Sequence, residues 1–542
     1  MPAAAAPLKV AVLADGGRLP RFACDAIRGI EGCEGITLFS CTNTRTRKRL
    51  VKHAGYYALN LLSVRNAQTR ALPAVECGKR IDEEVEFESL YDGAWQRLPE
   101  AVVGRLSGFD VVLKIGMGLM RVPGADVLPV PILSYHHGDP DRYRGRPAGF
   151  WEIVEGTPVM GQMVQAIGDK LDAGRVVAYA ETKVYPWSFR KTLVESFAHS
   201  PLILNAAIRN ALSGADLGKP CKGRNYRLPS NLTVAAFVLR MAARFLRRLL
   251  YGALVEKKWK VSLADASGPA EALFDGRSFP PRSGWRTLEE AKNYVFYADP
   301  FFSADPPGLL VEALSREGIG EIVLVGDEGH RRVSNWPGHL SYPATVEVDG
   351  RQLLLPEMAA TSAPILFTLE SGAMVPVGPL PLAKEARIAD PTIVKHQGRV
   401  YLFGTLPEVG NNVLHLWSAD SMAGPFVLHP QSPVRISPAG SRMAGQILHA
   451  EAGLLLRLGQ DFRMDYGDGI FAFAIEEMSA SAYREREIGE LRFSGVRGPH
   501  TLNVRGGELL FDWYVDSVSP AAGLRRLFGR LRRRQAARAS SE

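Results

Sequence analysis

The sequence predicts a multidomain chain in which an N-terminal open, mostly parallel α/β sheet is followed by a C-terminal all-β propeller. The chain has 542 residues, whereas single hydrophobic cores stop growing at about 250–300 residues. Apolar runs alternate with helical patterns at its start, and short strands separated by Gly, Pro and Asp fill its second half. With 46% hydrophobic and 23% charged residues, the composition excludes a disordered, collagenous or polytopic membrane protein.

The α/β prediction rests on four short apolar runs. Residues 10–14, 36–40, 110–115 and 131–135 are rich in Val, Leu and Ile and are typical of buried strands, and a helical pattern covers residues 22–30. Such alternation with short loops favours a parallel sheet covered by helices on both faces.

The cysteines and the N-terminal segment bear on the cellular compartment. Five cysteines lie within the first 221 residues without a CxxC spacing or a paired framework, which disfavours a secreted disulfide fold. The segment before Asp15 has one lysine and no long apolar run, so it reads as a first strand and not as a signal peptide. We therefore expect a cytoplasmic protein.

Residues 186–260 are expected to form a helical connector. Within it, residues 232–254 place four arginines on one helix face and apolar side chains over much of the rest; the arginines are Arg240, Arg244, Arg247 and Arg248. Four arginines argue against a membrane-spanning helix. Two alternatives stay open, a surface helix packed on the domain core and a helix lying on a membrane surface.

The propeller prediction rests on a turn glycine followed by an apolar strand, repeated five times at intervals of 42, 48, 55 and 54 residues; the glycines are Gly308, Gly350, Gly398, Gly453 and Gly507. Repeats of about 40–55 residues are typical of propeller blades. A further repeat, Ala298-Asp299-Pro300 and Ala389-Asp390-Pro391, supports five blades over residues 261–520. The alternative is an irregular β-sandwich with coincidental spacing.

Polar residues gather after the strand at 131–135, at the edge where open α/β sheets bind ligands. The run Ser134–Gly145 contains His136, and Asp172 follows in a glycine-flanked loop, residues 168–174. A carboxylate can orient an imidazole and stabilise its charged form while the imidazole moves a proton.

These segments resemble the formyltransferases that use 10-formyltetrahydrofolate, which act on methionyl-tRNA, glycinamide ribonucleotide or sugars. The family pattern Asn-x-His, then Leu-Leu-Pro and aromatic-Arg-Gly, is similar to Ser134-Tyr135-His136 and Tyr143-Arg144-Gly145, and Leu-Asp-x-Gly matches Leu171–Gly174. The resemblance implies a Rossmann-type domain over residues 1–185 with His136, Asp172 and Ser134 as catalytic residues. It also implies that 10-formyltetrahydrofolate is bound by backbone loops at Gly116, Met117, Gly118, Leu119, Gly168 and Asp169.

Two departures from the family pattern concern the same loop. Ser134 stands where the family has an Asn that donates a hydrogen bond to the developing oxyanion, and Asp139-Pro140-Asp141 replaces Leu-Leu-Pro. A serine hydroxyl offers one proton, and losing an oxyanion donor costs about 10²–10³ in rate; His137 could donate instead. The loop arginines, which either grip a phosphate or are solvated, are Arg142, Arg144 and Arg146.

The second half resembles the domain at the N-terminus of glucosamine inositolphosphorylceramide transferases, which is similar to five-bladed glycosidase propellers. The matching pieces are Tyr297–Phe301, Leu355-Pro356-Glu357, Ala389–Thr392 and Gly498-Pro499-His500. The resemblance implies that Asp299, Glu357 and Asp390 line a substrate pocket. Because the acidic order differs from the glycosidase order Asp, Asp, Glu, we expect sugar binding and not hydrolysis.

Together these features predict an N-formyltransferase that acts on the amine of a nucleotide-linked or lipid-linked amino sugar in glycan biosynthesis, with the propeller binding glycan or acceptor. One alternative is methionyl-tRNA formylation. Another is a glycan-binding or glycan-cleaving propeller with a degenerate formyltransferase domain. No metal site is predicted, and the sequence leaves the oligomeric state open.

The net charge of +8 is concentrated in two segments. Residues 231–260 and the tail 521–542 each hold seven basic residues against one acidic residue. Two short basic segments that also contain apolar residues favour attachment to an anionic membrane surface over a broad nucleic-acid face, with solvated segments as the alternative. We therefore expect small-molecule or lipid-linked substrates, no nucleic-acid partner, and a position in the cytoplasm or at the inner face of the membrane.

Overall fold

The structure is a computed structural model that describes residues 7–43, 51–65, 68–93, 95–120, 128–167, 174–219, 221–266 and 268–527. The chain divides into two compact units, Met1–Leu246 and Arg247–Glu542. The boundary lies within one long helix, α7 (Asn231–Leu254). Each unit is described by itself.

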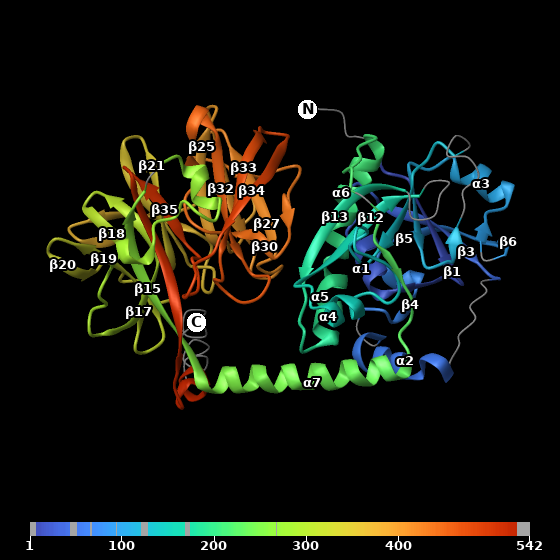
Figure 1. The fold of residues 1–542 in the computed structure, drawn as a ribbon. Helices are drawn as coiled ribbons and strands as arrows, with labels where there is room; N and C mark the ends of the chain where they lie inside the picture. The colour runs from blue at the N-terminus through green and yellow to red at the C-terminus, as the bar shows by residue number, and fades with distance from the viewer. Residues whose placement is uncertain are drawn as a thin grey trace. The chain divides into compact units, whose positions relative to one another are not determined.

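A seven-stranded sheet forms the framework of the first unit (Figure 1). Its strands, in order across the sheet, are β13 (Arg175–Lys183), β12 (Val159–Ala166), β10 (Ile132–His136), β8 (Val111–Ile115), β1 (Val10–Asp15), β3 (Gly35–Cys41) and β5 (Arg80–Phe87). Neighbours from β10 to β5 run parallel, and β12 and β13 are antiparallel. The four strands expected from the apolar runs, and the mostly parallel sheet, are confirmed.

The strand order reverses between β1 and β8. From β1 the chain proceeds outward through β3 to β5, then returns to β8 on the other side of β1 and continues to β10. At such a point the loops after two adjacent parallel strands diverge and leave a crevice at their carboxyl ends, where ligands of open α/β sheets bind.

Helices pack against the sheet through apolar side chains. On α3 (Glu100–Leu106), Val102 and Leu106 share a core with Ala11 and Leu13 of β1. Elsewhere α5 (Phe189–Ala198) and α6 (Ser200–Leu212) contact β12 and β13, and α1 (Arg21–Arg28) contacts α6. The remaining elements of this unit are α2 (Ala54–Asn60), α4 (Phe150–Glu155), β2 (Arg18–Pro20), β4 (Ala71–Pro73), β6 (Leu90–Asp92), β7 (Trp95–Arg97), β9 (Leu119–Met120), β11 (Tyr143–Gly145), β14 (Arg224–Tyr226) and the single turns η1 (Val51–His53), η2 (Leu61–Arg65) and η3 (Ala74–Cys77).

The structure corrects the expectation that the cysteines are unpaired. Cys24 of α1 and Cys77 of η3 form a disulfide, 53 residues apart in sequence. Sequence spacing could not show this pair, because the contact between α1 and η3 brings the two residues together.

Five antiparallel sheets make up the second unit. Four of them contain strands that are consecutive in the chain. These are β17 (Tyr294–Ala304), β18 (Pro307–Ser315), β19 (Gly320–Gly326) and β20 (Gly329–Arg332); β21 (Ser341–Val348), β22 (Arg351–Glu357), β23 (Ile365–Glu370) and β24 (Ala373–Pro379); β25 (Ala389–His396), β26 (Arg399–Thr405), β27 (Val413–Ala419), β28 (Val427–Leu428) and β29 (Arg435–Ile436); and β30 (Ala439–Met443), β31 (Leu448–His449), β32 (Leu455–Asp461), β33 (Ile470–Met478) and β34 (Tyr483–Leu491).

The fifth sheet joins the two ends of the unit. It contains β16 (Arg286–Thr287), β15 (Val255–Asp265), β36 (Glu508–Val518) and β35 (Leu502–Arg505), and β15 pairs with β36 along its whole length. The described part of the unit also contains three single turns, η4 (Ala270–Phe274), η5 (Arg282–Gly284) and η6 (Glu451–Gly453), and a helical segment at residues 522–527. Five sheets with this closure are compatible with a propeller.

The five recurring glycines lie at equivalent places in these sheets. Each lies at the turn before, or at the start of, the strand that is second across its sheet, counted from the edge strand β17, β21, β25, β30 or β35. These second strands are β18, β22, β26, β32 and β36, and each of the five glycines has a positive φ. Glycine adopts this conformation without the steric cost that other residues meet. The repeat in the sequence therefore marks the first hairpin of each sheet.

The first strands repeat a second feature, an irregularity in pairing. The register shifts between Ala298 and Phe301 in β17, between Ser341 and Ala344 in β21, between Ala389 and Thr392 in β25, and between Ala439 and Met443 in β30. Such bulges re-aim side chains next to functional sites.

The expected helical connector, residues 186–260, is not helical at its end. β15 begins at Val255, and each residue from Val255 to Asp265 pairs with a residue of β36. No helix in the described part of the chain is long and apolar enough to cross a membrane. The division into 1–185, 186–260, 261–520 and 521–542 stays a prediction; α5 and α6 pack on the sheet of the first unit.

Candidate functional sites

The crevice at the β1–β8 reversal contains a pocket of about 500 Å³. Its wall includes the loop after β8, with Gly116, Met117, Gly118 and Leu119, and the end of β10, with Ser134. The remaining lining residues are Phe22, Lys114, Ile115, Tyr135, His137 and Arg146. The structure therefore brings the predicted loop residues of this stretch and Ser134 to one cavity.

The loop after β8 is held by two neighbouring side chains. The Asp15 carboxylate accepts a hydrogen bond from the Met117 amide at 2.9 Å, and the Gln96 amide oxygen accepts one from the Gly118 amide. Met117 has a φ of 54°, a conformation that non-glycine residues adopt at a cost of about 1–3 kcal/mol. Strain of this kind persists where the surroundings fix the backbone, so this loop is preorganised.

Lys114 was not predicted from the sequence, because it lies inside an apolar strand. Its ammonium group donates to the Gly116 carbonyl at 3.1 Å. Burial lowers the pKa of Lys114 to about 8, against the opposing effect of Asp15. With Arg146, it supplies the pocket with two cationic side chains.

The two neighbouring histidines have different surroundings. The residues lining the pocket include His137 but not His136. The Nε2 atom of His136 lies 3.0 Å from the Tyr143 carbonyl; since a carbonyl only accepts, Nε2 carries a proton and Nδ1 is the acceptor of the neutral ring. Burial lowers the pKa of His137 to about 3, so that ring is neutral at pH 7.

Not all of the predicted residues are among those that line the pocket in the described part of the chain. Gly168, Asp169 and Asp172 lie outside the described residues. Of the three loop arginines, only Arg146 lines the pocket, while Arg144 donates to the Cys221 carbonyl at 3.5 Å.

A second cluster of polar groups lies in the C-terminal unit, and it contains all three predicted carboxylates. Arg442 binds Glu357 at 2.9 Å and also contacts both oxygens of Asp390. Gln460 donates to Asp390 at 2.9 Å. Burial raises the pKa of Asp390 to about 8, Arg442 opposes this shift, and Glu357 adds to it.

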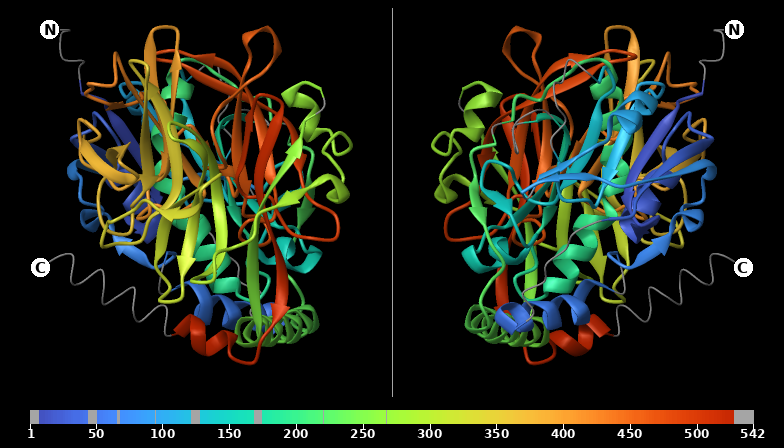
Figure 2. Two further views of the ribbon diagram at one scale, coloured as in Figure 1. Left: turned by 90° about the vertical axis from the view of Figure 1, so that its left-hand side faces the viewer. Right: turned by 90° about the vertical axis from the view of Figure 1, so that its right-hand side faces the viewer.

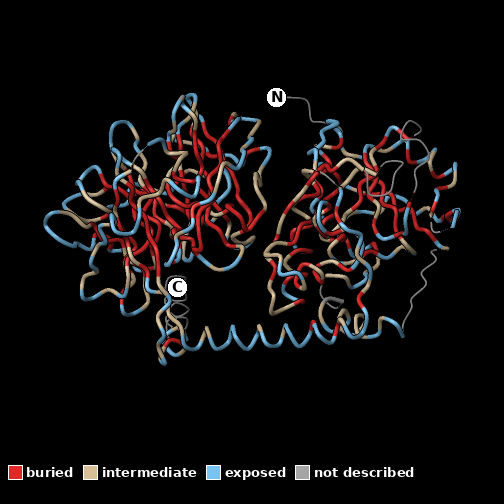
Figure 3. The backbone as a smooth tube through the Cα atoms, viewed as in Figure 1, coloured by how far each residue is buried: buried red, intermediate tan, exposed pale blue. Residues whose placement is uncertain are grey.

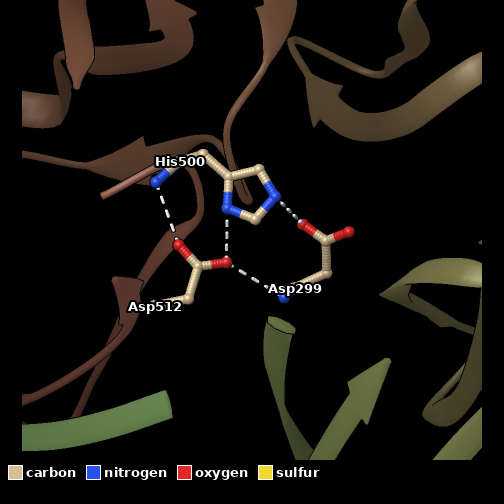
Figure 4. A group of neighbouring side chains, drawn as sticks. All are labelled: Asp299, His500 and Asp512. Carbon is tan, nitrogen blue, oxygen red and sulfur yellow. Dashed lines mark hydrogen bonds and ion pairs between the residues drawn. The ribbon is translucent and has the colours of Figure 1, made fainter. Parts of the chain in front are cut away.

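Asp299 belongs to an adjoining chain of ion pairs (Figure 4). His500 lies between two carboxylates, with Nε2 at 3.2 Å from Asp299 and Nδ1 at 2.6 Å from Asp512. Burial opposes the charged imidazolium, but Asp512 and Asp299 outweigh it and raise the pKa of His500. These three residues could offer ligands to a metal ion.

Glu312 connects the two groups. Burial, followed by the charges of Asp299 and Glu357, raises its pKa well above the usual range. Its carboxyl lies 3.6 Å from the His339 ring.

The register shifts of the first strands place this cluster. Asp299, Tyr342, Asp390 and Arg442 each lie within one of the four shifted segments. The first three have φ values of 47°, 44° and 48°, and each precedes a proline, a position that disfavours such values. The cluster is therefore built at a backbone cost, which is typical of functional sites.

The family model described as "Glucosamine inositolphosphorylceramide transferase 1, N-terminal" matches residues 333–503. Glucosamine inositolphosphorylceramide transferase 1 of Arabidopsis thaliana is 27% identical over 186 residues, which are 30% of this chain and 23% of that protein. The chain thus spans about a quarter of the length of this relative.

Solved structures similar to this chain include formyltransferases. Glycinamide ribonucleotide transformylase 1 from Symbiobacterium toebii has a TM-score of 0.28 and 19% identity, covering 40% of this chain and 93% of its own. A sugar 3N-formyltransferase crystallised with dTDP and 5-N-formyl-THF has a TM-score of 0.26 and 11% identity, covering 40% and 69%. We draw no functional inference from similarity at this level. The family match, by contrast, confirms that residues 333–503 are similar to the N-terminal part of glucosamine inositolphosphorylceramide transferases, as the sequence motifs predicted.

Proposed function

We propose that the N-terminal unit transfers a formyl group from 10-formyltetrahydrofolate to the amine of an amino sugar. The observation that carries this proposal is the position of the motif: Ser134, in the place of the family's oxyanion donor, lines a pocket together with the preorganised loop at residues 115–119. The strand order also supports the proposal, because the pocket lies where open α/β sheets bind ligands.

The pocket residues fit a flat, anionic ligand of this kind. Its volume of about 500 Å³ lies within the range of about 300–1,000 Å³ for small-molecule sites. Phe22, Ile115 and Leu119 offer apolar surface for a ring system, and Lys114 and Arg146 offer positive charge for carboxylates. The bound folate would supply an activated one-carbon group.

In this proposal, residues at the end of β10 transfer the proton and stabilise the oxyanion. The neutral His136 ring can accept a proton from the attacking amine at Nδ1, because Nε2 is committed to the Tyr143 carbonyl. Ser134 can donate its hydroxyl proton to an oxyanion. The role of Asp172, as the carboxylate that stabilises the charged imidazole, rests on the sequence motif alone.

The C-terminal unit binds the sugar part of the substrate in this proposal, with its five sheets as the blades of a propeller. The similar relative is named for a glucosamine-containing lipid, which supports an amino sugar as the ligand. The Arg442 guanidinium donates hydrogen bonds to both Asp390 and Glu357, and a carboxyl group held in this way is a poor nucleophile or base. We therefore propose sugar binding, and not hydrolysis, for this cluster.

A binding experiment tests the donor site. The full chain is titrated calorimetrically with 5-formyltetrahydrofolate, a stable folate. Leu119, which lines the pocket and is 43% exposed, is replaced by Trp to fill the cavity, and Leu212→Trp, at an exposed site on α6, is the matched control. We expect binding by the wild type and the control and none by Leu119→Trp. Equal binding by the wild type and both variants would show that folate binds outside this pocket. No binding by any of the three proteins would contradict the proposal.

The acceptor is tested by following folate release from 10-formyltetrahydrofolate with nucleotide-linked amino sugars, lipid-linked amino sugars and methionyl-tRNA. Release with amino sugars, lost in His136→Ala and in Asp172→Asn, is the expected result. Release with tRNA alone would favour methionyl-tRNA formylation. Glycan binding without release would favour a degenerate formyltransferase domain.

A further inference from the structure

We infer that α7 and the adjoining C-terminal segment form a docking surface for an anionic lipid bilayer. Of the 24 residues of α7, only Val234 and Phe237 are buried, and the helix is exposed along most of its length (Figure 3). The two buried residues pack into the apolar core beside α4 and α5. The other faces of the helix present large side chains to solvent.

An apolar stripe runs along the exposed side of α7. We define the α7 stripe as Leu232, Leu239, Leu246 and Leu250, which are separated by seven, seven and four residues and so share one helix face. The first three are 82%, 72% and 57% exposed. Exposed apolar residues arranged on one side of a helix mark a surface that is covered in use.

The charges on α7 favour an anionic bilayer as the partner of the α7 stripe. The helix contains four arginines and no acidic residue. In a pair of such helices from two copies of the chain, arginines would face arginines without a carboxylate to compensate them. A bilayer with anionic headgroups accepts the leucines and attracts the arginines at the same time.

Two further features extend the surface. Arg526 donates to the Gly252 carbonyl at 2.7 Å, which ties the segment after β36 to the end of α7 (Figure 2), and this segment adds Leu524 and Leu527 as exposed apolar residues. At the other end, a pocket of about 260 Å³ between α4 and α7 is lined by Arg240 and Arg244. A lipid phosphate is an anion that arginines in such a cleft can bind.

The test is sedimentation of the full chain with vesicles of phosphatidylcholine alone or of equal parts phosphatidylcholine and phosphatidylglycerol. We expect binding to the mixed vesicles only, decreasing as salt is raised. Leu239→Glu/Leu246→Glu is expected to weaken this binding at least about tenfold. The matched control, Val377→Glu/Leu428→Glu, introduces the same charge at two exposed apolar residues of the sheets and is expected to bind as the wild type does.

Because all four substituted residues are exposed, both variants should unfold at the wild-type temperature. As a second probe, Arg240→Gln/Arg247→Gln should lose the preference for anionic vesicles. Three results would overturn the inference: no sedimentation with either vesicle, equal sedimentation with both, or unchanged binding by the stripe variant. A wild-type dimer that dissociates in the stripe variant, without vesicle binding, would instead assign the stripe to a second copy.

Discussion

Arg442 is the residue on which the C-terminal cluster depends. It lies between Glu357 and Asp390, and its side chain is 14% exposed. Removing this cation leaves the acidic groups beside it without their ion-pair partner, which costs more than the ion pair itself contributes.

We therefore expect Arg442→Met, which keeps much of the side-chain volume, to lower the free energy of unfolding by about 3–5 kcal/mol in urea titrations. Arg399→Met is the control, because the partner of Arg399 is Asp420, a carboxylate that is 85% exposed; surface pairs contribute only about 0–1 kcal/mol. An equal decrease in the free energy of unfolding in the two variants would show that the ion pairs of Arg442 contribute no more than a surface ion pair.

Glu312 should make stability depend on pH. Burial raises the pKa of Glu312 well above its ordinary value of 4.5 in the folded protein, so the unfolded chain releases this proton first as pH rises. The contribution of Glu312 to the free energy of unfolding is fully present below pH 4.5. It is lost as the pH rises toward the pKa of Glu312 in the folded protein, by up to about 1.4 kcal/mol per pH unit. The difference in unfolding free energy between Glu312→Gln and the wild type should therefore increase as the pH is raised above 4.5. A difference that stays constant with pH would show that Glu312 is ionised in the fold.

Ser134 offers a gain-of-function prediction, which rests on the proposed function. Asparagine reaches further than serine and donates through an amide, as the motif of the resembling family does. We expect Ser134→Asn to raise the rate of formyl transfer by about tenfold or more and Ser134→Ala to lower it, measured as initial rates at saturating donor. Ser134→Asn slower than Ser134→Ala would exclude an oxyanion contact at this position.

At the scale of elements, the sequence predicted the regular parts and missed the irregular ones. The recurring glycines marked the start of the second strand across each of the five sheets, because glycine adopts the positive φ of the preceding turn without steric cost. The two Asp-Pro copies marked register shifts in β17 and β25. The equivalent shift in β21 carries Tyr342, which also precedes a proline but has no carboxylate, and the shift in β30 carries Arg442, which precedes Met443.

The candidate sites show the same limit. The residues at 116–119 and Ser134 were predicted, since loops after parallel strands meet at one edge of a sheet. Lys114 was not, because a lysine within an apolar run gives no signal of its burial. Gly498-Pro499-His500 was recognised as a motif, yet its role depends on Asp512, which only the pairing of β35 with β36 brings near.

At the scale of the whole molecule, each unit has its own core, and in the second unit β15, near its start, pairs with β36, near its end. Leu510 of β36 is fully buried and pairs with Leu263 of β15 and Asn503 of β35. A charge at this position would separate the strands that join the ends of the unit.

We expect Leu510→Asp to remove the calorimetric unfolding transition of the C-terminal unit and to leave that of the N-terminal unit in place, since a buried unpaired charge costs at least several kcal/mol. Val518→Asp, on the same strand at a residue that is 79% exposed, should leave both transitions unchanged. Loss of both transitions in Leu510→Asp would show that the two units fold as one.

The central claim, formyl transfer to an amino sugar, is tested most directly by following the formyl carbon itself. The full chain is incubated with isotopically labelled 10-formyltetrahydrofolate and the panel of nucleotide-linked and lipid-linked amino sugars, and the products are examined by mass spectrometry. The account predicts the label on the sugar amine in the presence of the wild type and its absence with His136→Ala. Label found only in formate released by hydrolysis of the donor, and on none of the amino sugars, would contradict it.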